Sequence, residues 1–426
     1  MKHRSTAVAG IAVAASLVLA GCTGGGSGDT GSGSGSGEVT GEITFQTWSL
    51  KNDKFTPYFE GVVKAFEKEH PGTTVKWVDQ PSEGYEDKIL QQAESGELPD
   101  VVNLPPEYAY SLASADQLLD LGSASKVIDD YVPGGVAAYE YDGVEGSFAF
   151  PWYLGTELNY WNTSLLAKGG VTAPPKTFDE TLDAAEKLAA AGVPMFSSVP
   201  SPKTLQIVGA APDIYKDGKF VFNTPEAAKI IDRYAELYKA GAITAEALQG
   251  AGTANSNINI FNTGGVAWTT AGPNYIDKDV AVNAPNLLPD VDVTNGFGNP
   301  PLFVQGISVS KNSKNSATAL AFAEFVTNTE NQIAFVKLAA GFFPGTVAAN
   351  ADPSVFAEAP VNELQGTATS LAAEQMADAK QTGAPQYTEA METYAKQQIA
   401  LAVTGEITGQ EALDKAVEYA QQNVVG

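Results

Sequence analysis

The sequence predicts an α/β fold in which helices cover the faces of a parallel sheet. Segments with strand and helix patterns alternate over residues 43–104, in the order of a parallel β-α-β-α-β unit. Similar signals continue through the second half of the chain. The hydrophobic content of 44% is ordinary for a globular protein, so 426 residues can bury a core without metals or disulfides.

Three short segments near the start predict strands: 43–48, 75–78 and 99–104. Between them, apolar residues recur at helical spacing, first from Phe59 to Phe66 and then from Tyr85 to Ala93. A His-Pro-Gly sequence at 70–72 ends the first helix, and Gly96 ends the second.

The second half shows helix starts and a hairpin. Capping boxes pair Thr177 with Glu180 and Thr408 with Glu411, and each predicts a helix. Asp217-Gly218 predicts a hairpin turn. Further helices are predicted from 225 to 240, from 316 to 327 and from 329 to 340.

The first residues predict an export signal. Lys2 and Arg4 precede an apolar run over 7–20, which is too short to span a bilayer comfortably and ends at Gly21-Cys22. This order resembles the bacterial lipobox, so we expect cleavage after residue 21 and lipidation of Cys22. The alternative, a buried or disulfide-bonded thiol, is disfavoured because Cys22 is the only cysteine and a Gly/Ser-rich linker follows to residue 40.

Composition excludes several functions. The formal net charge of −25 argues against nucleic acid as a partner and gives no attraction to anionic lipid, so membrane residence must come from acyl chains on Cys22. The only histidines are His3, in the cleaved segment, and His70. Serine, cysteine and zinc catalysis therefore lack their usual partners, and only chemistry by paired carboxylates survives.

A calcium-like pattern occurs at Asp290, Asp292 and Asn295-Gly296. The position of the bidentate glutamate in an EF-hand loop is Pro301 here, so we interpret the segment as a plain loop and expect no metal and no cofactor.

Six stretches in order carry a resemblance to a known family. They are 96–102, 115–121, 150–162, 174–178, 261–268 and 307–314. Together they resemble the family 1 extracellular solute-binding proteins, which serve sugar ABC importers. The resemblance covers nearly the whole mature chain and is specific for the family but not for the ligand.

The resemblance implies a two-lobed, periplasmic-binding-protein-like fold of type II, with a hinge and a ligand cleft between the lobes. We expect an N-terminal lobe of residues 41–155 plus 304–345, and a C-terminal lobe of residues 156–303 plus 346–426. It further implies a monomer that binds a carbohydrate and delivers it to membrane permease subunits from the outer face of the membrane.

Candidate ligand residues in the first lobe begin with Trp48, at the carboxyl end of the first strand, where open α/β sheets bind ligands. Core packing is the alternative for this ring. Glu107 and Tyr108 follow the third strand, where the resemblance implies a sugar-binding acid; the alternative is a surface carboxylate.

Trp152 and Tyr153 fall at the predicted crossing between lobes, either lining the cleft or packing the lobes together. Trp268 and Asn274 flank Ala271-Gly272-Pro273. Maltodextrin-binding members of the family carry tryptophan where this chain has Asn274, which replaces a stacking ring with a hydrogen-bonding amide.

Phe343, with Phe342 before it, either stacks on the ligand or belongs to a buried turn. Tyr394 lies on a late helix, where it either stacks on the ligand or packs against a neighbouring helix. The leading hypothesis is a non-catalytic receptor that captures an oligosaccharide by hinge closure and delivers it to a membrane permease energised by an ATPase. This chain itself has no Gly-Lys-Ser/Thr phosphate loop. The alternatives are a lipid-anchored glycoside hydrolase with a carboxylate pair and a surface adhesion protein.

Overall fold

The computed structural model describes residues 37–248, 254–357, 359–376 and 378–424. Cys22, the predicted signal peptide and most of the predicted linker lie outside the described residues. In the described part of the chain, no helix combines the length and apolarity that crossing a membrane requires.

A six-stranded sheet has the strand order β11-β4-β10-β3-β1-β2. Its strands are β1 (Gly41–Trp48), β2 (Thr73–Gln80), β3 (Val101–Leu104), β4 (Phe150–Gly155), β10 (Phe303–Val309) and β11 (Phe343–Pro344). The predicted parallel unit is confirmed, because β1 runs parallel to both β2 and β3. The neighbouring strands β10, β4 and β11 pair antiparallel, so the complete sheet is mixed.

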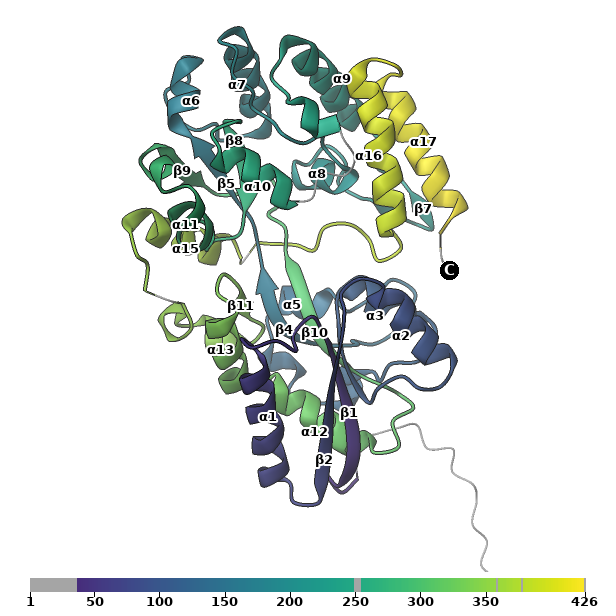
Figure 1. Cartoon of the computed structure of the whole chain (residues 1–426). Coiled ribbons are helices and arrows are strands. Elements are labelled where there is room, and N and C mark those ends of the chain that lie inside the picture. The colour runs from purple at the N-terminus through teal and green to yellow at the C-terminus, as the bar shows by residue number, and fades with distance from the viewer. Residues whose placement is uncertain (1–36, 249–253, 358, 377, 425–426) are drawn as a thin grey trace, which may run out of the picture. The chain divides into compact units, whose positions relative to one another are not determined.

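Helices from both parts of the sequence accompany this sheet (Figure 1). They are α1 (Thr56–Glu69), α2 (Tyr85–Glu94), α3 (Pro106–Ser114), α4 (Leu121–Ala124), α5 (Pro133–Ala137), α12 (Ser316–Val326), α13 (Thr329–Leu338) and α14 (Val347–Asn350). The apolar face predicted for α1 is buried at Phe59, Val62 and Phe66, and the helix ends at its C-cap His70 as predicted.

A three-stranded antiparallel sheet has the order β8-β5-β9. Its strands are β5 (Leu158–Asn162), β8 (Trp268–Ala271) and β9 (Val291–Thr294), and β6 (Tyr215–Lys216) and β7 (Lys219–Phe220) form a hairpin. The helices of this part are α6 (Thr163–Lys168), α7 (Phe178–Ala190), α8 (Pro202–Ile207), α9 (Pro225–Ala240), α10 (Ala254–Asn262), α11 (Ala281–Asn283), α15 (Glu363–Gln375), α16 (Glu389–Thr404) and α17 (Gly409–Gln422).

Local sequence signals set several of these boundaries. The Thr408–Glu411 capping box is confirmed at the start of α17, with both reciprocal bonds present. At α7 the Thr177 hydroxyl accepts from the Glu180 backbone N–H as predicted, but the Glu180 carboxylate accepts from the Lys176 N–H instead of that of Thr177. The Asp217-Gly218 hairpin is confirmed.

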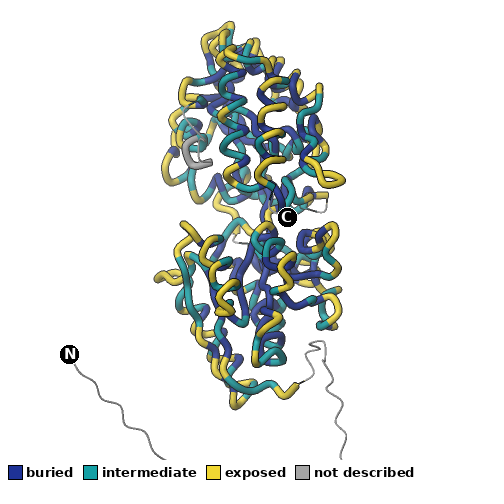
Figure 2. The backbone as a smooth tube through the Cα atoms, turned by 90° about the vertical axis from the view of Figure 1, so that its right-hand side faces the viewer, coloured by how far each residue is buried: buried dark blue, intermediate teal, exposed yellow. Residues whose placement is uncertain are grey.

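Two clusters of buried side chains form the core. The larger covers the six-stranded sheet and continues to β5 and α15, and the second is built mainly by α7, α9, α16 and α17. Figure 2 shows these buried segments in dark blue, with exposed turns in yellow. The lobe boundaries remain a prediction; the six-stranded sheet takes its strands from 41–155 and 303–344, and β4 leads to β5 through Thr156 and Glu157.

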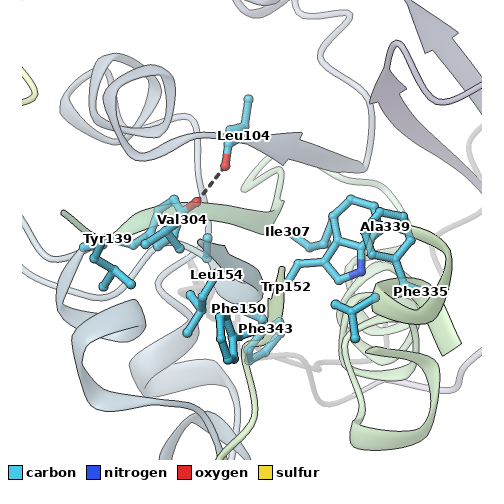
Figure 3. Packing of buried hydrophobic residues seen from close by; sticks show 14 of the residues in the cluster. Leu104, Tyr139, Phe150, Trp152, Leu154, Val304, Ile307, Phe335, Ala339 and Phe343 are labelled. Atoms are coloured by element: carbon cyan, nitrogen blue, oxygen red, sulfur yellow. Dashed lines mark hydrogen bonds between the residues drawn. The ribbon is translucent and has the colours of Figure 1, made fainter. Parts of the chain in front are cut away.

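One close approach requires glycine. A Cβ on Gly306 in β10 would lie 2.6 Å from the Tyr139 hydroxyl oxygen and 2.8 Å from the Ala149 Cβ. The Tyr139 hydroxyl donates a 2.7 Å hydrogen bond to the Leu104 carbonyl, which fixes the ring against the sheet (Figure 3). The absence of a side chain on Gly306 therefore lets β10 pass beneath this buried ring.

Candidate functional site

A cavity of about 380 Å³ lies beside β5 and β8. Side chains from α8, α9, α10, α16 and the 296–303 loop complete its wall. The wall mixes aromatic rings with hydroxyl, amide and charged groups. This volume and this mixture are typical of a site for a small ligand.

The pairing of β5 with β8 fixes the position of Trp268, one of the aromatic residues in the cavity wall. In β8, Trp268 lies opposite Trp161 and Thr270 lies opposite Asn159 of β5. Because side chains alternate along a strand, these four share one face of the sheet. The Trp268 indole N–H donates a 3.0 Å hydrogen bond to the Asn159 amide oxygen, and the ring meets Phe196 edge-on at 5.5 Å. Trp268 is thus held in one orientation while it lines the cavity.

Glu157 provides a carboxylate to the same cavity from the connection between β4 and β5. Its backbone is fixed, since the Gln375 side chain donates both to the Glu157 carbonyl (2.8 Å) and to the Thr156 hydroxyl (2.7 Å). Burial raises the pKa of Glu157 above its ordinary value, and a hydrogen bond from Thr270 opposes that shift. Within the described residues, no cationic side chain lies within 4 Å of this carboxylate.

Two lysines also line the cavity. On α16, the Lys396 ammonium lies 3.4 Å from a carboxylate oxygen of Glu392, one helical turn away. The second Glu392 oxygen is buried and, among the described residues, has no hydrogen-bond partner. Lys203, on the first turn of α8, is partly buried and has no ion pair with any described residue.

An exposed ring stands at the edge of the cavity. Phe303, the first residue of β10, is 46% exposed although it is large and apolar. A Cβ on Gly155 would lie 3.6 Å from the Phe303 Cβ and 3.2 Å from the ring of Phe342, which is itself 39% exposed. The partly exposed rings of Phe303 and Phe342 therefore lie next to Gly155, two residues before Glu157.

Comparison with known proteins identifies the family. Residues 61–363 match the pattern of the bacterial extracellular solute-binding proteins, which is more than half of the chain. The chain belongs to this family. Its members bind solutes outside the cytoplasm and are not classified as enzymes, as the sequence resemblance implies.

A curated relative is the putative ABC transporter periplasmic-binding protein YcjN of Escherichia coli strain K12, 28% identical over 199 residues. The alignment covers 41% of this chain and 44% of the relative, so the chain matches less than half of that protein's length.

Solved structures share the fold. A putative oligosaccharide periplasmic-binding protein from Synechococcus sp. MITs9220 has a TM-score of 0.74 at 24% identity, covering 89% of this chain and 98% of its own. The GacH receptor of Streptomyces glaucescens GLA.O, solved unliganded and with acarbose, has a TM-score of 0.69 at 21% identity, covering 91% and 100%. The predicted α/β, two-lobed periplasmic-binding-protein-like fold is confirmed.

Of the nine ligand residues predicted from sequence, Trp268 lines the cavity of this solute-binding protein. Three others gather at the carboxyl ends of β1 and β3. Trp48 stacks on Tyr85 with ring centroids 5.6 Å apart, and Tyr85 lies 6.4 Å from Tyr108. Glu107 and Tyr108 lie on the first turn of α3. The Trp48 indole N–H is buried and has no acceptor among the described residues.

Acidic groups surround this aromatic row. Burial, and then the charges of Glu86, Glu107, Glu389 and Asp87, raise the pKa of Tyr108 to about 12. Burial also raises the pKa of Glu86, with Glu107 the next contribution. The row is therefore a largely buried aromatic cluster bordered by acidic side chains, and its role in binding remains a prediction.

The predicted pair at β4 is mainly core. Trp152 is fully buried, and its ring centroid lies 4.3 Å from that of Phe335 (Figure 3). Tyr153 is partly buried and contacts Phe335 at 5.2 Å and Phe342 at 4.9 Å. The Trp152 ring lies among other side chains of the core around the six-stranded sheet and does not line the cavity.

Asn274 and Phe343 line a separate cavity of about 50 Å³. The Asn274 amide donates a 2.8 Å hydrogen bond to the Ala340 carbonyl, so this side chain links the segment after β8 to the end of α13. Phe343 is only 4% exposed, because β11 pairs with β4 and turns that ring inward. The neighbouring Phe342 is the exposed member of the pair.

Tyr394 stacks on Tyr419 of α17, with ring centroids 4.1 Å apart and planes 15° from parallel. Glu392 and Lys396 line the cavity from the same helix, and Tyr394 lies between them in sequence on a different face. In this structure Tyr394 packs two helices together.

Sequence reasoning missed Glu157, Lys203 and Phe303. Glu157 and Phe303 had a usable signal, since both lie at predicted boundaries between the lobes, which fall after residues 155 and 303. Lys203 lies in no pattern that distinguishes it from a surface residue. Among the described residues, no group of three or more His, Cys, Asp or Glu side chains is placed to hold a metal ion. Asp290 ends a short 3-10 helix and Asp292 lies in β9.

Proposed function

We propose that this solute-binding protein captures a carbohydrate in the 380 Å³ cavity. One observation carries the proposal: the Trp268 ring, the Glu157 carboxylate and the exposed Phe303 ring border a single cavity rich in hydroxyl side chains. A sugar ring offers an apolar CH face, which an aromatic ring can cover, and hydroxyl groups, which a carboxylate can accept. The GacH receptor, which was solved in complex with acarbose and shares the fold, supports this ligand class.

Delivery to a membrane permease follows from the family and from the relative's name as an ABC transporter component. In this proposal, closure around the carbohydrate selects the form that docks on the permease. A lipid on Cys22 holds the protein at the outer face of the membrane, and the Gly/Ser-rich linker separates the anchor from the folded part. The protein works as a monomer.

We also propose that the protein does not cleave the carbohydrate that it binds. A glycoside hydrolase needs one carboxylic acid and one free carboxylate on either side of the scissile bond. Glu157 and Glu392 both line the cavity, and Glu392 is paired with Lys396. An ion pair does not prevent a carboxylate from acting as a base or nucleophile, so the absence of turnover rests on the family, whose members are solute-binding proteins.

A glycan panel tests the function. Purified protein lacking residues 1–21 is melted with oligosaccharides, amino acids and polyols, and hits are measured by titration calorimetry. A true ligand at a hundredfold excess over its Kd raises the unfolding free energy by about 2.7 kcal/mol. Mass spectrometry of the recovered glycan then checks that it is intact.

The outcomes separate the functions. A shift with one glycan class and no cleavage supports the receptor. Cleavage of that glycan would instead support the lipid-anchored hydrolase. If no compound of the panel binds, the carbohydrate assignment is wrong and the surface adhesion alternative gains weight.

A further inference from the structure

The charges in the cavity suggest which carbohydrate it selects. Lys203 lies at its wall, partly buried, with neither an acidic group within 4 Å nor a hydrogen-bond acceptor in the described part of the chain. In the described part of the chain the other lysines that lack an acid within 4 Å are exposed, whereas Lys203 is partly buried. A partly buried ammonium without a partner lacks the compensation that such groups normally have.

The other lysine of the cavity provides an internal comparison. Lys396 has Glu392 at 3.4 Å, and Glu392 is only 13% exposed at its side chain. The opposite charges of Lys396 and Glu392 therefore compensate each other in the ligand-free protein. Lys203 has no such neighbour, so its charge is available to a ligand.

Other hydrogen-bond donors line the cavity with Lys203, which suits a ligand that carries an acceptor group. A Cβ on Gly383 would lie 3.1 Å from the Lys203 Cε, so the lysine stem runs along the backbone at Gly383. Next to that glycine, Thr382 lines the cavity, as does Ser198 in the loop before α8. Neither hydroxyl has a hydrogen-bond partner among the described residues. An ammonium and two free hydroxyls line the same cavity as donors.

We infer that the cavity selects an acidic glycan, one that carries a carboxylate such as that of a uronic acid, and that Lys203 pairs with this carboxylate. The inference rests on the proposed carbohydrate function. A single uncompensated lysine matches a single negative charge, and the unpaired carboxylate of Glu157 in the same cavity would repel a phosphate dianion more strongly. Glu157 is left to accept hydroxyl groups from the rest of the ligand.

Paired ligands and matched variants test the inference. Calorimetry compares a disaccharide ending in glucuronic acid, its neutral glucose-terminated counterpart and glucose 6-phosphate. The proteins are wild type, Lys203→Met, Lys203→Arg and the control Lys229→Met, which removes an exposed lysine of α9 outside the cavity. Thermal melts of each ligand-free variant check that it is folded.

We expect wild type to prefer the acidic disaccharide over the neutral one by about 10- to 150-fold, the usual effect of a charge-assisted hydrogen bond. Lys203→Met should abolish that preference without changing affinity for the neutral sugar, Lys203→Arg should keep most of it, and Lys229→Met should keep all of it.

Equal binding of the two disaccharides, or a preference that survives Lys203→Met, overturns the inference while leaving the carbohydrate function intact. A preference for glucose 6-phosphate overturns the assignment of a carboxylate. If the wild type binds none of the wider glycan panel, the proposed function fails, and this inference fails with it.

Discussion

Glu157→Gln isolates the role of the unpaired carboxylate. The substitution keeps the shape of the side chain and removes its charge. Hydrogen bonds to charged groups contribute about 1.5–3 kcal/mol each. Loss of one such bond from a ligand hydroxyl therefore weakens binding by about 10- to 150-fold. Titration calorimetry at pH 7 with the panel's best glycan measures this loss.

The same variant should stabilise the ligand-free protein at neutral pH. Because burial raises the pKa of Glu157, the folded state holds its proton more tightly than the unfolded state does. The unfolding free energy therefore falls as pH rises from the ordinary glutamate pKa of 4.5 through the raised value in the folded state. Glutamine removes this decrease, so the melting temperature of Glu157→Gln should exceed that of wild type at pH 7.

Binding should depend on pH in the opposite sense. The carboxylate accepts hydroxyl hydrogen bonds best when ionised, so wild-type affinity should fall as pH drops through the raised pKa, while Glu157→Gln affinity stays flat. Glu236→Gln, an exposed position on α9, is the matched control. If Glu157→Gln lowers the melting temperature and keeps full affinity, Glu157 serves the fold through its bond with Thr270 and the reasoning is refuted.

Three further substitutions test the site and the core. Trp268→Ala should weaken glycan binding about tenfold or more by removing a stacking ring, with calorimetry as the measurement; unchanged affinity would place the ligand elsewhere. Trp152→Ala should cost about 3–5 kcal/mol of unfolding free energy in a denaturant titration, since the ring is fully buried against Phe335; a stable variant that no longer binds would return Trp152 to the site. Gly306→Ala should cost about 1–3 kcal/mol, because the new Cβ would lie 2.6 Å from the Tyr139 hydroxyl, and a neutral effect would mean that β10 can shift.

Elements encoded locally could be predicted from the sequence. The three strands over 43–104, the helix end at His70, the Asp217-Gly218 hairpin and the α17 capping box each depend on residues within a few positions of one another. The antiparallel partners of the sheet could not be predicted in this way. β10 joins β3 across about two hundred residues, and no local pattern records that pairing.

The candidate site was harder to predict, because its groups come from distant segments. Trp268 lies within a family-like motif and could be named in advance. Glu157, Lys203 and Phe303 meet at one cavity only because β5, α8 and β10 meet there. A lone lysine in a sequence carries no sign of such a site, because its role depends on the groups that the fold brings beside it.

Register explains which member of each aromatic pair is buried. Side chains alternate along a strand, so in Phe342-Phe343 and in Trp152-Tyr153 only one ring can face the core. The pairing of Phe343 with Leu154, and of Pro344 with Tyr153, turns Phe343 and Trp152 inward and leaves Phe342 and Tyr153 in mutual contact at 4.9 Å. Phe342 and Phe343 are identical in chemistry, and Trp152 and Tyr153 are both large aromatic residues, so residue type alone could not decide which ring is buried. A shift of one residue in this pairing would exchange the buried and exposed rings.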